Sequence, residues 1–267
     1  MGDGGRSAYR ADVSPGLPPE AEAHYRTYVE GDRLDRHWIE RVRTQAVLAQ
    51  ALPQGPLDIL DVGGGTGVHA AWLADRGHRV TLVDAMPEHV DEALSFGTFA
   101  AVVGDARALA QTDGSADAVL LLGPLYHLTE GADRVGALAE ARRVLRPGGL
   151  LVAGAVTYTA SLLDGIGQGW MGDPAFVDIV RADLGTGQHR NPTADPRWFT
   201  TTFFHRPDEL RAEVESAGFV ADRIIGVEGP GWIVGEPEES LTAAELADAH
   251  PELAVLSAHL LAIGHTR

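Results

Sequence analysis

A run of glycines follows directly on a short apolar segment and opens a stretch with helical spacing. The run, Asp61-Val62-Gly63-Gly64-Gly65-Thr66-Gly67, joins a carboxylate to backbone that carries few side chains. Glycines let a ligand approach the backbone closely, and the first turn of a helix presents N–H groups that the helix itself does not use. The spacing therefore predicts a loop whose amides hold an anionic group of a ligand.

A second carboxylate, Asp84, stands about 20 residues further on, where the next apolar segment (78–84) ends. An acidic side chain in this place can accept hydrogen bonds from both hydroxyls of a ribose. Ligands of open α/β sheets bind at the carboxyl ends of the strands, where the glycine loop and Asp84 would both lie. Together they predict a site for a nucleoside-bearing cofactor.

The spacing of the glycines separates two classes of cofactor. A dinucleotide fingerprint requires G-x-G-x-x-G, and counting from Gly63 places Val68 where the third glycine belongs. The form present, D-x-G-x-G-x-G, resembles the first motif of class I S-adenosylmethionine-dependent methyltransferases. Further segments match that family in order: Asp84 after the second strand, Gly104-Asp105-Ala106, LLGPLYHL (121–128), LRPGGLLV (145–152) and ESAGF (215–219).

The resemblance implies an α/β fold with a doubly wound, Rossmann-like sheet of seven strands, its last strand antiparallel between the fifth and the sixth. It also implies S-adenosylmethionine as the methyl donor and S-adenosylhomocysteine as the product. The glycine loop would hold the methionine part, Asp84 the ribose and Asp105 the adenine amino group, with Leu109 and Met86 against the adenine ring. The cofactor-binding residues expected on this basis are Asp61, Gly63, Gly64, Gly65, Gly67, Asp84, Ala85, Met86, Gly104, Asp105, Ala106 and Leu122, with Tyr25 and Arg33 of an N-terminal lid.

Two histidines are candidates for a general base. His127 follows the end of a strand, where the acceptor of a methyl group should lie, and His205 precedes a helix. Each could instead pack or satisfy nearby backbone. An acceptor that is a phenol, hydroxyl or amine needs such a base, whereas a carboxylate is already ionised at neutral pH.

Aromatic residues in the later, glycine-rich part of the chain are candidates for the acceptor pocket. Tyr126, Trp170, Trp198 and Trp232 fall after predicted strands. They could line a pocket, or they could form the core of an inserted subdomain. The sequence leaves both readings open.

The elements that would position these residues alternate between strand and helix over residues 57–156, as in right-handed βαβ units with a parallel sheet. The full division expected is a disordered tail (1–20), N-terminal lid helices (21–56), a cofactor-binding core (57–156), a substrate-lid insertion (157–204), and a C-terminal part of the core (205–267) with a short insertion near 230–255.

Composition narrows the function further. The 267 residues contain no cysteine, which excludes thiolate chemistry. The formal net charge of −17 disfavours nucleic acid and anionic membrane surfaces as partners, because they carry charge of the same sign. The scattered histidines predict no metal site. No segment resembles a secretory signal or a membrane span, so a cytoplasmic monomer or homodimer is expected.

The function expected from the sequence is methyl transfer to a small-molecule or peptide acceptor, on oxygen or nitrogen and possibly on a carboxylate, in bacterial specialised metabolism. The alternatives are an NAD-dependent oxidoreductase and a cofactor-binding module without catalysis. The incomplete dinucleotide fingerprint argues against the first alternative.

Overall fold

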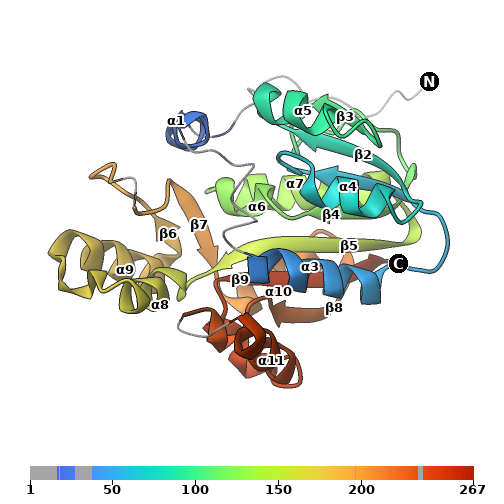
Figure 1. Ribbon diagram of the computed structural model, residues 1–267. Coiled ribbons are helices and arrows are strands. Elements are labelled where there is room, and N and C mark those ends of the chain that lie inside the picture. The colour runs from blue at the N-terminus through green and yellow to red at the C-terminus, as the bar shows by residue number, and fades with distance from the viewer. Residues whose placement is uncertain (1–16, 18, 28–37, 196, 234–236) are drawn as a thin grey trace, which may run out of the picture.

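The computed structural model describes residues 17, 19–27, 38–195, 197–233 and 237–267 (Figure 1). One mixed sheet forms the centre, and its first five strands are parallel, in the order β3-β2-β1-β4-β5. Strands β1 and β2 come from apolar runs that end at the glycine loop and at Asp84, so both sites lie at the carboxyl edge. The five strands are β1 (Asp58–Val62), β2 (Arg79–Asp84), β3 (Ala100–Val103), β4 (Ala116–Leu121) and β5 (Leu145–Thr157).

The last two strands complete the sheet in the expected way. Strand β9 (His259–Thr266) is antiparallel to both β5 and β8 (Phe219–Gly226), and it lies between them. Because β9 runs against β5, its first residue, His259, pairs with Val156 near the carboxyl end of β5. The predicted α/β fold with an antiparallel last strand is confirmed.

Helices cover both faces of the sheet because alternate strand residues are apolar on opposite sides. Leu60 and Val119 belong to a core cluster shared with Leu138, whereas Ile59 and Leu120 belong to another cluster. The helices of the first face are α7 (Gly131–Val144) and α10 (Pro207–Ser216). Those of the second face are α3 (Trp38–Ala51), α4 (Val68–Ala74) and α5 (Pro87–Leu94).

Residues 157–204 are more regular than the sequence indicated. They contain α8 (Ala160–Gly167), the 3-10 turn η2 (Trp170–Gly172), α9 (Pro174–Thr186), β6 (Gln188–His189) and most of β7 (Thr202–His205). Helices α8 and α9 lie beyond the end of β5, at the left in Figure 1. Strand β7 pairs with the end of β5 and β6 pairs with β7, so the sheet has nine strands rather than the expected seven.

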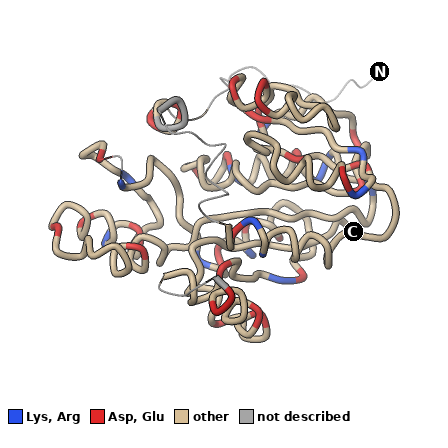
Figure 2. Tube along the Cα trace, in the orientation of Figure 1, with Lys and Arg blue, Asp and Glu red and all other residues tan. Residues whose placement is uncertain are grey.

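The remaining elements are short and surround the carboxyl edge or β8. They are α1 (Pro19–Thr27), α6 (Pro124–His127), η3 (Pro230–Ile233), α11 (Pro237–Ala247) and η4 (Pro251–Leu256). None of the helices described is long and apolar enough to cross a bilayer. Acidic residues outnumber basic ones and are spread over many elements, including α5, α9 and α11 (Figure 2).

Candidate functional site

A large pocket opens at the carboxyl edge of the parallel strands. It holds about 1280 Å³ of space not filled by atoms, counting its mouth toward solvent. A nucleoside-sized cofactor and a small acceptor would fit such a volume together. Its wall includes Asp61, Gly63, Gly64, Gly65, Asp84, Ala85, Gly104, Asp105, Ala106, Leu122, Tyr126 and His127. Most of the residues singled out from the sequence therefore meet in one place.

The glycine loop has the backbone that its sequence suggests. Gly65 lies at φ +56°, in the left-handed region, and a Cβ placed there would meet no atom within 4 Å. Gly67 also has a positive φ, of +90°, but a Cβ there would come within 2.7 Å of the ring of Phe99. Gly67 is not among the pocket-lining residues described, and its surroundings show a role in packing α4; its contact with the cofactor stays a prediction.

Asp84 organises the loop as well as facing the pocket. Its Oδ2 accepts a hydrogen bond from the Gly65 N–H at 2.9 Å, and its Oδ1 accepts one from the Met86 N–H at 2.9 Å. Nδ1 of His89, which also lines the pocket, lies 3.2 Å from Oδ1. A carboxylate has about four acceptor positions, so the position still open at Oδ2 is the one suited to a ribose hydroxyl.

Asp61 differs from Asp84 and Asp105 in having no side-chain hydrogen-bond partner among the described residues. Its side chain is buried, and neither oxygen has a hydrogen-bond partner among the described residues. Burial, with a smaller contribution from the charge of Asp84, raises the pKa of Asp61 to about 7. A buried carboxyl group on a pocket wall suits a cationic ligand group, which would supply both charge and hydrogen bonds. The ammonium of a bound methionine moiety has this chemistry, so the residues present fit S-adenosylmethionine.

Asp105 lines the pocket with its carboxylate already engaged. The Arg107 guanidinium donates to it at 2.7 Å through Nη2, and the Arg107 backbone N–H donates to Oδ1 at 2.8 Å. Arg107 also contacts Asp133 at 3.2 Å. The sequence analysis did not identify Arg107, although its position two residues after Asp105 could have indicated an Asx-type turn. The adenine contact of Asp105 stays a prediction.

The apolar residues expected at the adenine ring lie behind the pocket wall. Met86 is 3% exposed and Leu109 is 4% exposed, and neither is among the described residues that line the pocket. The backbone N–H of Leu109 donates to Glu140 on α7, and the Leu109 side chain belongs to the core cluster that α7 shares. Ala106 is the apolar neighbour that does line the pocket at this point.

The two predicted bases have different surroundings. His127 lines the pocket next to Tyr126, with 4.6 Å between their ring centroids. His205 is 0% exposed and absent from the described pocket wall, and its Nε2 lies 3.2 Å from Glu213. Burial lowers the pKa of His205. His205 therefore packs inside the protein, away from the described pocket wall, and its role as a base stays a prediction that this placement does not support.

The three predicted tryptophans serve the packing of other segments. Trp198 is 4% exposed and packs on Phe176, while Trp170 meets the same ring edge-on. Trp232 donates its Nε1–H to the Leu256 carbonyl at 2.8 Å. None of the three is among the described residues that line the pocket, and their contact with substrate stays a prediction that this packing does not support. Arg33 lies outside the described residues, as does the side chain of Tyr25.

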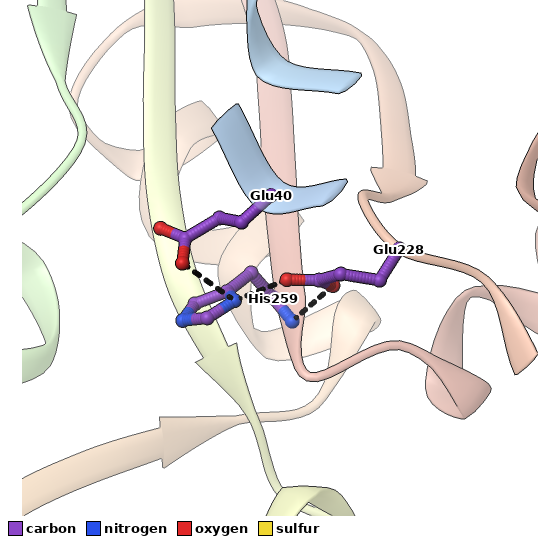
Figure 3. Close-up of side chains that lie close together, drawn as sticks. All are labelled: Glu40, Glu228 and His259. Atoms are coloured by element: carbon purple, nitrogen blue, oxygen red, sulfur yellow. Dashed lines mark hydrogen bonds and ion pairs between the residues drawn. The ribbon is translucent and has the colours of Figure 1, made fainter. Parts of the chain in front are cut away.

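A histidine between two glutamates is the part of the site that sequence reasoning missed. Glu40 on α3, Glu228 after β8 and His259 at the start of β9 converge (Figure 3). His259 Nδ1 lies 2.5 Å from Glu228 Oε1 and 3.9 Å from Glu40 Oε2. Glu40 and His259 line the pocket. No local pattern marks this group, because its members are brought together only by the antiparallel β9 and the packing of α3.

Comparison with known proteins agrees with this geometry. Residues 60–153 match a family model described as a methyltransferase domain. An uncharacterized methyltransferase of Mycobacterium tuberculosis is 38% identical over 101 residues, which are 38% of this chain and 40% of that protein. A ubiquinone biosynthesis O-methyltransferase of Xylella fastidiosa is 27% identical over 211 residues, 76% of each chain.

A solved structure extends the likeness over nearly the whole chain. The N-methyltransferase NodS from Bradyrhizobium japonicum, in complex with S-adenosylhomocysteine, superposes with a TM-score of 0.56 at 17% identity, covering 92% of this chain and 97% of that one. The fold and residues 60–153 are thus those of the class I S-adenosylmethionine-dependent methyltransferases, which confirms the resemblance and the cofactor class. The chain spans less than half the length of the M. tuberculosis relative.

Proposed function

We propose that this protein transfers a methyl group from S-adenosylmethionine to a small-molecule or peptide acceptor. One observation carries the proposal: a pocket wall that joins the unpartnered, buried carboxyl of Asp61, the open backbone at Gly65 and the carboxylate of Asp84. A positive and a sugar-like ligand group would each find a matching carboxylate there, and the backbone at Gly65 leaves room for the ligand to approach. The matches to methyltransferases support the same activity.

Each part of the pocket has a role in this proposal. Asp61 would hold the ammonium of the methionine part, the glycine loop would lie along that part, and Asp84 would bind the ribose. The bound cofactor supplies an electrophilic methyl group. The chain then aligns the acceptor with that methyl and keeps water away, which is the main source of catalysis for such a displacement.

The charge of the pocket favours neutral or cationic acceptors. Glu40, Asp61, Asp84 and Asp105 all line it, and Arg107 is the one arginine or lysine among the described lining residues. Arg107 is itself bonded to Asp105 and close to Asp133. We therefore favour methylation on a hydroxyl or an amine over methylation of a carboxylate, as part of bacterial specialised metabolism.

Isothermal titration calorimetry tests the cofactor assignment. S-adenosylhomocysteine should bind with a Kd on the order of micromolar, and NAD should give no heat. Binding of NAD alone would overturn the proposal in favour of an oxidoreductase. Binding of S-adenosylhomocysteine without transfer of labelled methyl to any member of a broad acceptor panel would favour a module that has lost catalysis.

A further inference from the structure

His259 stands at the acceptor side of the pocket because of its place in the sheet. It opens β9 and pairs with Val156, two residues beyond Gly154 on β5. Gly154, Ala155, Leu260 and His259 all line the pocket. Strands β5 and β9 lie on the far side of β4 from the glycine loop and Asp84. His259 therefore faces the same cavity as the donor site, from the opposite half of the sheet.

Glu228 fixes the His259 ring. Its Oε1 lies 2.5 Å from Nδ1, and its Oε2 accepts the backbone N–H of the same histidine at 3.0 Å. The Glu228 side chain is 4% exposed, so solvent does not compete for these bonds. When Nδ1–H is donated to a carboxylate, the lone pair of the neutral ring is on Nε2. Figure 3 shows Nε2 on the side of the ring away from Glu228.

The surrounding charges suit a ring that gains a proton. Glu40 Oε2 lies 3.9 Å from Nδ1, so two carboxylates from different elements face the ring. Arg43 on α3 is directed away from them, toward the Val227 carbonyl at 3.1 Å and Asp248 at 2.6 Å. An imidazolium at this place would therefore be paired with negative charge, which lowers the cost of forming it.

The same geometry argues against a metal ion held by the three side chains. Two ligands at about 2.1 Å from a tetrahedral cation are about 3.4 Å apart. The 2.5 Å between Nδ1 and Glu228 Oε1 is a hydrogen-bonding distance that leaves no room for an ion between them. The carboxylate positions the ring.

We propose that His259 is the general base of the methyl transfer, with Glu228 as its positioning residue, and that the acceptor carries a proton on oxygen or nitrogen. This inference rests on the proposed methyltransferase function. Nε2 of His259 takes the proton of the acceptor hydroxyl or ammonium. The lone pair of the acceptor heteroatom forms the new bond to the methyl carbon, and the electron pair of the broken carbon–sulfur bond stays on sulfur.

The test uses one variant that separates the basic nitrogen from the hydrogen bond. His259→Asn keeps an N–H donor near the position of Nδ1 and can still bond Glu228, but it has no group that accepts a proton. The matched control is His265→Asn. His265 is near the other end of β9 and pairs at 2.8 Å with Asp222 on β8, and both side chains are over two-fifths exposed.

Transfer of labelled methyl is measured with catechol, ethanolamine and benzoate as a phenol, an amine and a carboxylate acceptor. With catechol or ethanolamine, His259→Asn should lower kcat by about 100-fold and remove the acidic limb of the pH–rate profile, which reports protonation of the base. His265→Asn should leave both unchanged. Glu228→Gln, which keeps the ring but weakens its positioning, should give an intermediate loss in kcat with little change in KM.

The outcomes separate this inference from the proposed function. Affinity for S-adenosylhomocysteine should stay within about twofold in all variants, since β9 and β5 lie on the far side of β4 from the glycine loop and Asp84. Unchanged turnover in His259→Asn, transfer to benzoate alone, or no transfer to either protic acceptor would overturn the role of His259. Failure of the unaltered protein to bind S-adenosylhomocysteine would instead overturn the methyltransferase assignment itself.

Discussion

Asp84 shows how one side chain can serve the loop and the ligand at once. Its two oxygens accept hydrogen bonds from the backbone N–H groups of Gly65 and Met86. These bonds tie the glycine loop to the end of β2. Replacing Asp84 would therefore remove a ligand contact and also release the loop.

We expect Asp84→Ala to weaken binding of S-adenosylhomocysteine by roughly tenfold or more, because a charged hydrogen bond and the order of the loop are both lost. Calorimetry measures the change. Asp222→Ala is the control, since Asp222 is an exposed carboxylate on β8, paired with His265. Equal affinity in the Asp84 variant and the unaltered protein would refute the ribose assignment.

Asp61 should make stability depend on pH. Its pKa is about 7 in the folded protein, against 3.8 for the unperturbed group. Between these two pH values the folded state keeps a proton on Asp61 that the unfolded state has released. Stability is therefore full below about pH 4 and falls as pH rises through 7, by up to about 4 kcal/mol.

Asp61→Asn removes this titration and should stabilise the protein at pH 8 more than at pH 5. Urea unfolding at the two pH values measures the difference in free energy of unfolding. A stability difference between variant and unaltered protein that is the same at pH 5 and pH 8 would show that Asp61 does not titrate as described.

At the scale of elements, the entry into α4 depends on two glycines with similar backbone and different surroundings. Gly65 faces open pocket space, whereas Gly67, the residue before α4, contacts Phe99 and Ala93. A side chain at Gly65 would therefore affect ligand binding, whereas a side chain at Gly67 would disturb the packing of α4 against its neighbours.

Gly67→Ala should lower the free energy of unfolding by about 2–4 kcal/mol, from left-handed backbone strain and overpacking against Phe99. Gly65→Ala should cost only the strain, about 1–2 kcal/mol, while its methyl group intrudes on the ligand. Denaturant unfolding and calorimetry on both variants compare the two effects. Greater destabilisation by Gly65→Ala than by Gly67→Ala would contradict the assignment.

The elements that carry the glycine loop and Asp84 could be predicted from the sequence because their signals are local. The strand ending at Val62, the glycines after it and the carboxylate at Asp84 each depend on a few consecutive residues. The helices α8 and α9 were missed because glycines at 165, 167 and 185 lower helix propensity, and the packing of Phe176 on Trp198 and Trp170 compensates for that.

The same difference applies to the site: residues marked by a local sequence pattern could be predicted, and residues brought together from distant segments could not. Asp61, Asp84 and His127 were expected and do line the pocket. His205 looked like an equal candidate, since a sequence does not reveal that β7 buries it against Glu213. His259 was missed because its neighbours Glu40 and Glu228 are 219 and 31 positions away in the chain.

At the scale of the whole molecule, the pocket is assembled from segments that lie far apart in the described chain, from Leu17 to β9. A ligand bound at the glycine loop and Asp84 should slow hydrogen exchange in the segments that contact it and leave the exchange of other segments unchanged. Hydrogen exchange with saturating S-adenosylhomocysteine should slow about tenfold or more in residues 61–69 and 83–89, because their opening then requires ligand release.

Residues 174–186, in α9, should exchange at the same rate with and without this ligand, since none of them lines the pocket among the described residues. Mass spectrometry of peptides covers both regions in one experiment. Equal protection of α9 and the glycine loop would indicate a global stabilisation rather than binding at the proposed place.

The antiparallel entry of β9 has a consequence for how proteins of this kind diverge. The matched domain ends at residue 153, whereas Glu228 and His259 come after it and Glu40 before it. Mutations before residue 60 or after residue 153 can thus alter the acceptor that is methylated while the binding site for the methyl donor stays the same. Two homologues that look alike over residues 60–153 can act on unrelated compounds, and sorting them by chemistry will require reading the flanks.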